Sequence, residues 1–464
     1  MKYVLFAAAL ALCGVGAVAQ TSVDLSIDQA RNVATQALVS GEPALAVQIA
    51  EAILAQLPDD RTALIVIAAA APRAGDPAKG RVAGARAWRV SSSDAQRYEA
   101  ARLTALAAAN EERFTLSTFW LRRALTVAPN EEERTQTLRD ARVVSQRNPW
   151  STQLSFSLVP SSNVNGGAED EDLIIGGNDT GGNISEDGLA LSGWRASLGF
   201  GTQYRFQENA QSRSTVGLSY QISRVRITED TTVPDEAFDT SFYSLSIRHD
   251  RALENGTLSF RGARGLYEYR DLDLATETTE YDKYDIWRLG VDRRFVVNDQ
   301  TLLSVSADRE RLSYLKPSIG DVNRISLTGA ITYQLDSGNR ITTTLKLTDS
   351  DGDTPNYTSD EQSLSITYGF GEPLGPISLS VGGGLRWSTY PDYLVFDPSV
   401  FGFVEVDGGR QDETVFANAN IGFPDISYAG FTPGLRIDVS TTDSNVSRFD
   451  RNTFSAGFTI SSQF

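Results

Sequence analysis

Residues 194–206, WRASLGFGTQYRF, alternate apolar and polar side chains along the chain. Trp194, Leu198 and Phe200 fall on one face of an extended segment, whereas Arg195 and Ser197 fall on the other. Successive side chains of a strand point to opposite faces, so this period of two predicts a β-strand with one apolar face. The same alternation recurs in segments 325–333, 364–370 and 377–387.

Working outward from this segment, the chain after residue 148 contains fourteen segments with strand character. They lie near residues 151–159, 191–207, 213–227, 238–252, 256–270, 283–297, 300–314, 322–336, 339–348, 361–372, 376–389, 413–422, 427–440 and 451–464. The even number predicts an antiparallel outer-membrane β-barrel over residues 148–464, although a soluble sandwich would alternate too. Pro424 and Pro433 interrupt two of the segments, so twelve strands are the alternative.

The connections between these segments alternate in length. Residues 160–190, 228–237 and 271–282 make long connections, whereas QENAQ, LENG, VNDQ and DSGN make short ones. Bacterial barrels have short periplasmic turns and long external loops, so we expect both barrel termini in the periplasm. The acidic run from Glu169 to Asp172 is expected to form a mobile external loop, because like charges repel.

The chain ends FSAGFTISSQF, with Phe454, Phe458 and Phe464 on one face. A terminal strand that closes on phenylalanine is typical of barrels handled by the barrel assembly machinery. We therefore expect Phe464 to act in barrel assembly, and outer-membrane lipids to surround the finished barrel.

The first nineteen residues, MKYVLFAAALALCGVGAVA, have the features of an export signal. Lys2 precedes an apolar run, and Ala17-Val18-Ala19 offers a cleavage site before Gln20. Cys13 lies within this signal, so the exported chain is expected to contain no cysteine.

Residues 20–147 are rich in Ala, Leu, Arg and Glu, with apolar residues at helical spacings of three and four. Gly41 and Gly75 each open the second helix of a pair, and a third unit near Ser117 lacks the glycine. This spacing favours a tetratricopeptide-like repeat domain, placed in the periplasm by the barrel topology. An irregular helical bundle is the alternative.

The composition excludes several kinds of chemistry. One Cys and one His cannot build a zinc, haem or iron-sulfur site, so no metal and no cofactor are expected. The net charge of −17 argues against nucleic-acid binding. His249 is the only possible imidazole base of a hydrolase, and no motif surrounds it. We therefore expect no enzymatic activity and no catalytic residues.

Strand parity collects charged residues on the face that would line the lumen. The candidate lumen-lining residues are Arg195, Arg205, Arg288, Asp292, Arg386, Arg436 and Asp438, joined by Arg248, Arg294, Asp308, Glu310, Lys346. A polar face of this kind is suited to conduct or bind a transported molecule. Charges that pair across strands only to stabilise the barrel would give the same sequence pattern.

Several short motifs resemble the surface lipoprotein assembly modifier (Slam) family, the outer-membrane component of the type XI secretion system. They are Asn148-Pro149-Trp150, Pro160-Ser161-Ser162-Asn163-Val164-Asn165, Leu191-Ser192-Gly193 with Tyr204-Arg205, Ser444-Asn445 and Asp450-Arg451. The resemblance covers essentially the mature chain, and it implies a periplasmic repeat domain followed by a barrel of about fourteen strands. The acidic loop 166–190 and the imperfect third repeat depart from the family.

The resemblance implies an outer-membrane protein translocator that moves surface lipoproteins or secreted soluble client proteins. A polysaccharide export porin with a periplasmic repeat domain is the alternative, and a hydrolase built on His249 is a third hypothesis. The sequence leaves open the identity and lipidation of the client, the energy source and the oligomeric state. It also leaves open whether the client would follow the lumen or a strand edge.

Overall fold

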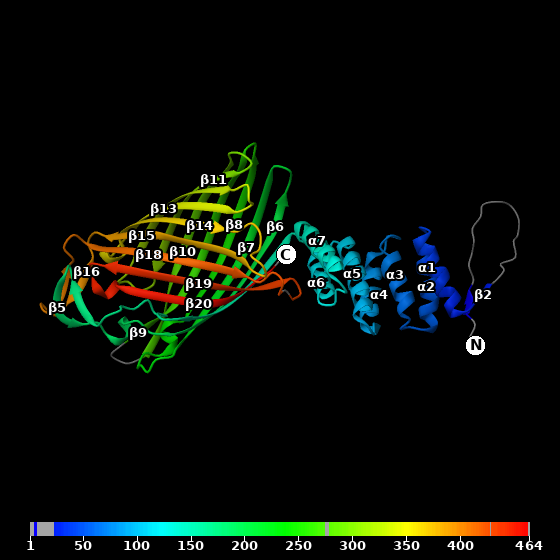
Figure 1. The fold of residues 1–464 in the computed structure, drawn as a ribbon, viewed down its shortest axis with the longest axis horizontal. Coiled ribbons are helices and arrows are strands. Elements are labelled where there is room, and N and C mark those ends of the chain that lie inside the picture. The colour runs from blue at the N-terminus through cyan, green and yellow to red at the C-terminus, as the bar shows by residue number, and fades with distance from the viewer. Residues whose placement is uncertain (1–3, 7–22, 274–277, 427, 463–464) are drawn as a thin grey trace. The chain divides into compact units, whose positions relative to one another are not determined.

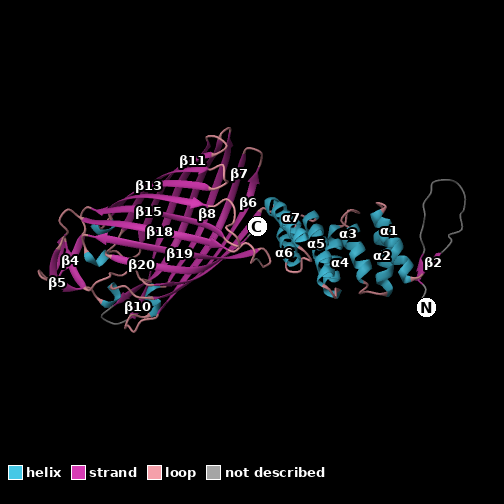
Figure 2. Ribbon diagram, in the orientation of Figure 1, coloured by secondary structure: helices cyan, strands magenta, loops and turns pink. Residues whose placement is uncertain are grey.

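In the computed structural model the chain folds as two compact units (Figure 1). The structure describes residues 4–6, 23–273, 278–426 and 428–462. One unit contains Met1–Asn148 together with Tyr428–Phe431, and the other contains Pro149–Ser427 and Thr432–Ser462. The first unit is helical and the second is a β-barrel (Figure 2).

Within the described residues the first unit has seven α-helices. They are α1 (Ile27–Val39), α2 (Pro43–Gln56), α3 (Arg61–Ala70), α4 (Pro77–Val90), α5 (Asp94–Asn110), α6 (Phe114–Leu125) and α7 (Glu131–Arg147). Five of these helices begin at a residue whose side chain caps the helix. Each capping side chain accepts a hydrogen bond from a backbone N–H of the first turn, which stabilises the helix end. The capping residues are Ser26, Asp60, Asp76, Ser93 and Asn130.

The helices form consecutive pairs joined by tight turns. Gly41 and Gly75 precede α2 and α4 with positive φ angles of 82° and 91°, a conformation that glycine adopts without a steric penalty. Small residues then allow close packing within the helix pairs. Ala46 and Ser117 are fully buried, and a Cβ atom on Gly80 would lie 2.7 Å from Pro72.

Fourteen strands close the barrel in the described part of the second unit. They are β3 (Trp150–Ser161), β6 (Gly193–Glu208), β7 (Ser212–Ile227), β8 (Thr240–Leu253), β9 (Gly256–Asp273), β10 (Thr278–Val296), β11 (Thr301–Tyr314), β12 (Asp321–Gln334), β13 (Arg340–Gly352), β14 (Ser359–Gly369), β15 (Ser378–Tyr390), β18 (Arg410–Gly422), β19 (Phe431–Ser444) and β20 (Arg451–Ser462). Neighbouring strands of the ring pair antiparallel, as in β10 with β11, and β20 pairs with β3 to complete the ring. The prediction of fourteen strands is confirmed.

One face of the barrel strands exposes large apolar side chains at every second position. Examples on β3 are Leu154, Phe156 and Leu158, and examples on β12 are Ile325 and Leu327. A closed sheet leaves no unpaired strand edge, so such a band meets the requirements of a lipid environment. The alternate positions carry the polar and charged side chains.

The two segments that Pro424 and Pro433 were expected to interrupt, near residues 413–422 and 427–440, correspond to strands β18 and β19. Pro424 lies beyond the end of β18, and Pro433 lies at the third position of β19, near the strand end, where a missing donor disrupts little of the ladder. No helix of the described residues is long and apolar enough to cross a membrane.

Two expectations about the connections are wrong. Residues 271–282 are not a long connection, because β9 and β10 pair through this segment up to Asp273 and Thr278. The loop 166–190 is not a free acidic loop. It contains the hairpin of β4 (Asp172–Ile175) and β5 (Asn178–Asn183), and Ile174 N donates to Ser447 Oγ at 2.9 Å.

Both chain ends are described only in part. Of the expected signal, the structure describes only Val4–Phe6 (β1), which pairs with Val23–Leu25 (β2). Phe464, the expected assembly residue, lies outside the described residues.

Candidate functional site

The helical unit contains a groove of about 1170 Å³. Its walls come mainly from α1, α3, α5 and α7, the alternate helices of the series. This placement follows from pairing: when helix pairs stack, the first helix of each pair lines one common face.

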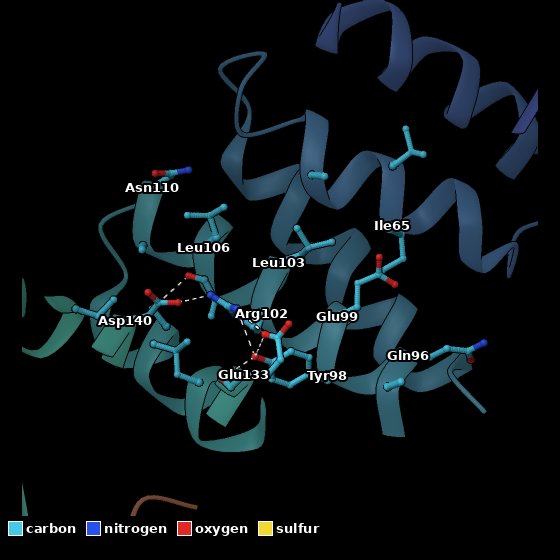
Figure 3. A pocket seen from close by; sticks show the side chains of 18 of the residues that line it. Ile65, Gln96, Tyr98, Glu99, Arg102, Leu103, Leu106, Asn110, Glu133 and Asp140 are labelled. Atoms are coloured by element: carbon cyan, nitrogen blue, oxygen red, sulfur yellow. Dashed lines mark hydrogen bonds and ion pairs between the residues drawn. The ribbon is translucent and has the colours of Figure 1, made fainter. Parts of the chain in front are cut away.

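An apolar strip runs along the groove (Figure 3). Ile65 on α3 and Leu103 and Leu106 on α5 lie along it. Val143 on α7 also lines the groove. Leu106 and Val143 are 53% and 56% exposed, although both are apolar. Exposed apolar residues gathered in a concavity are typical of a binding surface.

Ion pairs and hydrogen bonds hold α5 against α7 at the groove floor (Figure 3). Arg102 donates to Asp140 and, at 3.3 Å, to Glu133. Tyr98 Oη donates to Glu133 Oε2 at 2.6 Å and lies 2.9 Å from Thr137 Oγ1. Burial, followed by the hydrogen bond to Glu133, raises the pKa of Tyr98 above its usual value of 10.0.

The charged groups of the groove are largely neutralised by one another. Besides the Arg102 network, Arg61 pairs with Glu99 at 2.5 Å. A groove that combines an apolar strip with paired charges suits an amphipathic polypeptide better than a small, highly charged ligand.

Strand parity places the candidate lumen-lining residues on the polar face of the barrel strands. Arg288 on β10 pairs with Glu310 on β11, its register partner. Asp292 pairs with Arg261 at 2.7 Å, and Arg386 lies 3.7 Å from Glu361.

The remaining candidates also have partners. Arg195 donates to the carbonyl of Val164, Arg205 lies 3.1 Å from Glu208, and Arg436 lies 2.8 Å from Asp438. Among the described residues, Arg436 and Asp438 are the only two of the seven candidates that form an ion pair with each other. The others are each paired with residues outside that set.

One charge cluster links three strands of the polar face. Asp250 on β8 accepts from Arg213 at 3.0 Å, Arg248 at 2.7 Å and Ser259 at 2.6 Å. Arg248 is also the register partner of Arg261, so two positive charges face each other on neighbouring strands. Asp250 on one side, and Asp292 on the other, compensate this like-charge contact.

A row of aromatic rings crosses the polar face of four adjacent strands. Phe242, Tyr267, Tyr284 and Tyr314 are successive register partners on β8, β9, β10 and β11. Their ring centroids are 6.4, 5.0 and 4.5 Å apart along the row. The sequence analysis predicted neither this row nor the residues that line the groove.

His249 has a hydroxyl partner. Its Nδ1 lies 2.8 Å from Ser214 Oγ on the neighbouring strand β7, and Gln207 Oε1 lies 3.5 Å from the same hydroxyl. Ser214 is only 5% exposed, so a substrate has little access to this hydroxyl. The Ser–His contact therefore resembles a structural cross-strand hydrogen bond more than a nucleophile with its base.

The closed ring of fourteen antiparallel strands, with its apolar outer face, decides the class of the second unit. The chain is a fourteen-stranded barrel of the outer-membrane type. This is the fold of outer-membrane channels and transport proteins.

Comparison with known proteins finds solved barrel structures that resemble this chain, but it does not assign the chain to a family. No protein-family model and no curated protein matches the chain. A mutant of the monoaromatic hydrocarbon channel TodX is 12% identical over 68% of this chain and 90% of its own, with a TM-score of 0.36. A loop-deletion mutant of OmpT from Vibrio cholerae is 10% identical over 67% and 99%, with a TM-score of 0.32. OprD from Pseudomonas aeruginosa is 11% identical over 67% and 94%, with a TM-score of 0.31. Likeness at this level carries no functional argument.

Proposed function

We propose that this protein is an outer-membrane translocator for proteins, moving surface lipoproteins or secreted soluble clients, as the resemblance to the Slam family implies. In this proposal the barrel lies in the outer membrane and the helical unit lies in the periplasm. The helices, stacked as tetratricopeptide-like repeats, hold a client polypeptide before it passes the barrel.

The observation that carries the proposal is the groove of the helical unit. Its volume of about 1170 Å³ exceeds what an ordinary small-molecule pocket needs, and it exposes Leu106 and Val143 to solvent. A client segment would cover these side chains with its own apolar side chains. The paired charges of Arg102 and Arg61 would tolerate polar client residues beside the strip.

The proposal is tested by the surface display of a protein encoded next to this one. Leu106→Asp and Val143→Asp should each reduce display about tenfold, because a charge in the apolar strip loses roughly 1.4 kcal/mol or more of client binding. Val82→Asp is the matched control, since Val82 is 51% exposed on α4 and does not line the groove. Equal display by all three variants, with barrel levels held constant, would contradict the role of the groove.

Polysaccharide export is the second candidate, and the aromatic row favours it. Sugar rings pack on aromatic side chains, and Tyr267, Tyr284 and Tyr314 form a continuous aromatic row on the polar side of the barrel. The paired charges of the same face weigh against a path for a strongly charged polymer. Loss of a cell-surface polysaccharide on replacement of Tyr284 by Ala, with client display unchanged, would favour this candidate.

A further inference from the structure

The connection between β15 and β18 presents an exposed aromatic cluster. It contains a small hairpin of β16 (Leu394–Asp397) and β17 (Gly402–Glu405). Phe401 and Phe403 are 87% and 74% exposed, and both rings contact Phe396, at centroid distances of 5.8 and 5.7 Å. We call Phe396, Val400, Phe401 and Phe403 the aromatic tip.

The backbone holds the aromatic tip in a strained shape. Phe401 has a φ of 49°, in the left-handed region that bulky residues rarely adopt. Asp397 Oδ1 accepts from both the N–H and the hydroxyl of Ser399, at 2.8 and 2.6 Å, and Phe401 N donates to Pro398 O at 3.3 Å. The edge-to-face contact with Phe396 leaves Phe401 87% exposed, so the strained backbone presents most of this apolar ring to solvent. Strain of this kind indicates a functional constraint.

The segments around the aromatic tip are acidic, and the following Arg410 is buried and paired with Asp412. Residues 391–409 contain four carboxylates and no Lys or Arg. The β4–β5 hairpin lies beside this hairpin, since a Cβ atom on Gly182 would come within 2.4 Å of Pro398 Cγ. Both hairpins lie at the same end of the barrel (Figure 1). Residues 166–190, which contain β4 and β5, carry seven carboxylates and again no Lys or Arg.

From this combination we infer that the aromatic tip docks a cationic amphipathic segment of a partner protein. The apolar side chains of the partner cover Phe401 and Phe403, and its Lys and Arg side chains meet the carboxylates around them. The acidic rim disfavours an anionic lipid surface, which would bring like charges together. This inference goes beyond translocation and holds whether or not the barrel passes a polypeptide.

The test measures binding of a fluorescent Lys/Leu amphipathic helical peptide to the full-length protein in nanodiscs. We expect the peptide to bind, and the double variant Phe401→Ser/Phe403→Ser to weaken the affinity at least about tenfold. Leu315→Ser is the matched control, because Leu315 is 62% exposed in another connection of the same barrel end. It should leave the affinity unchanged. Heat-modifiable migration in gel electrophoresis verifies that each barrel is folded.

A second arm changes only the charge. Glu405→Gln/Asp407→Asn should weaken binding and reduce its dependence on salt, whereas a Glu/Leu peptide of the same length should not bind. The inference is overturned if the serine variants bind the Lys/Leu peptide like the unchanged protein. It is also overturned if the Glu/Leu peptide binds equally, if anionic lipid vesicles bind through Phe401, or if the aromatic tip mediates self-association instead.

Discussion

Gly75 and Glu112 adopt the same left-handed backbone conformation, with φ angles of 91° and 58°, at the turns before α4 and α6. The third helix pair therefore has the turn of the first two without its glycine. A residue with a Cβ atom pays a steric cost of roughly 1–2 kcal/mol in this conformation. The third repeat therefore differs from the first two in the residue at this turn, and its backbone geometry there is the same.

The first prediction follows from this turn. Glu112→Gly should raise the stability of the helical unit by up to about 1 kcal/mol, because Glu112 is exposed and the strain is removed. Gly75→Ala should lower the stability by a similar amount, since no atom crowds that position and only the backbone strain acts. Thermal unfolding of the full-length protein, followed at 222 nm, measures both. A lower melting temperature for Glu112→Gly would contradict the reasoning.

The second prediction concerns Tyr98 and pH. Its pKa is raised in the folded state, so the unfolded chain loses this proton first as the pH rises. The contribution to stability is complete below pH 10 and declines as the pH passes from 10 towards the folded-state pKa. Tyr98→Phe should remove this decline and cost about 1–3 kcal/mol at neutral pH, because buried Thr137 loses a partner.

Urea unfolding at pH 8 and at pH 10.5 separates the two effects of Tyr98→Phe. An unchanged difference in stability between the two pH values would mean that another group causes the alkaline decline.

The third prediction concerns the like-charge contact in the barrel. Asp250→Ala should destabilise the barrel by about 1–3 kcal/mol, since the buried carboxylate accepts three hydrogen bonds and its loss leaves the half-exposed Arg248 facing Arg261. Asp438→Ala is the control, because the Arg436–Asp438 pair is half-exposed and worth less than about 1 kcal/mol. The temperature at which heat-modifiability is lost should fall for Asp250→Ala alone. Equal temperature shifts in both variants would show that the hydrogen bonds of Asp250 stabilise the barrel no more than the Arg436–Asp438 pair does.

The fourth prediction concerns topology. The long connections are expected outside the cell, so Ser399→Cys should react with a membrane-impermeant thiol reagent on intact cells. Ser337→Cys, in the short connection between β12 and β13, should react only after permeabilisation. The only natural cysteine, Cys13, lies in the expected signal segment. Labelling of Ser337→Cys but not of Ser399→Cys on intact cells would invert the topology.

The barrel strands could be predicted because their signal is local. Every second residue of segment 194–206 is apolar except Thr202, and lipid on one side with a polar lumen on the other requires that alternation over the strand. The hairpins β4–β5 and β16–β17 could not be predicted in this way. Their strands are only four to six residues long, and contacts such as Ile174 with Ser447 join positions that are far apart in sequence.

The candidate site was predicted less well than the fold. The charged residues of the polar face follow from parity alone, but their partners depend on strand register, which the alternation of apolar and polar residues does not specify. The residues that line the groove were not predicted, because they come from five separate helices. A usable signal was the pair Tyr98 and Arg102, four residues apart on one helical face, with Glu133 and Asp140 on α7 as their partners.

Ring closure imposes an order on biogenesis. Ser162 Oγ accepts from Phe454 N across 292 positions of sequence, where the first barrel strand meets the last. Synthesis delivers β3 early and β20 at the very end, so β3 keeps one side unpaired until almost the entire chain has been exported. During that interval the chain is exposed to aggregation through this strand. A periplasmic holding factor should therefore be needed for the barrel more than for the helical unit, whose seven described helices follow one another between Ile27 and Arg147 and pack mainly on their neighbours in sequence.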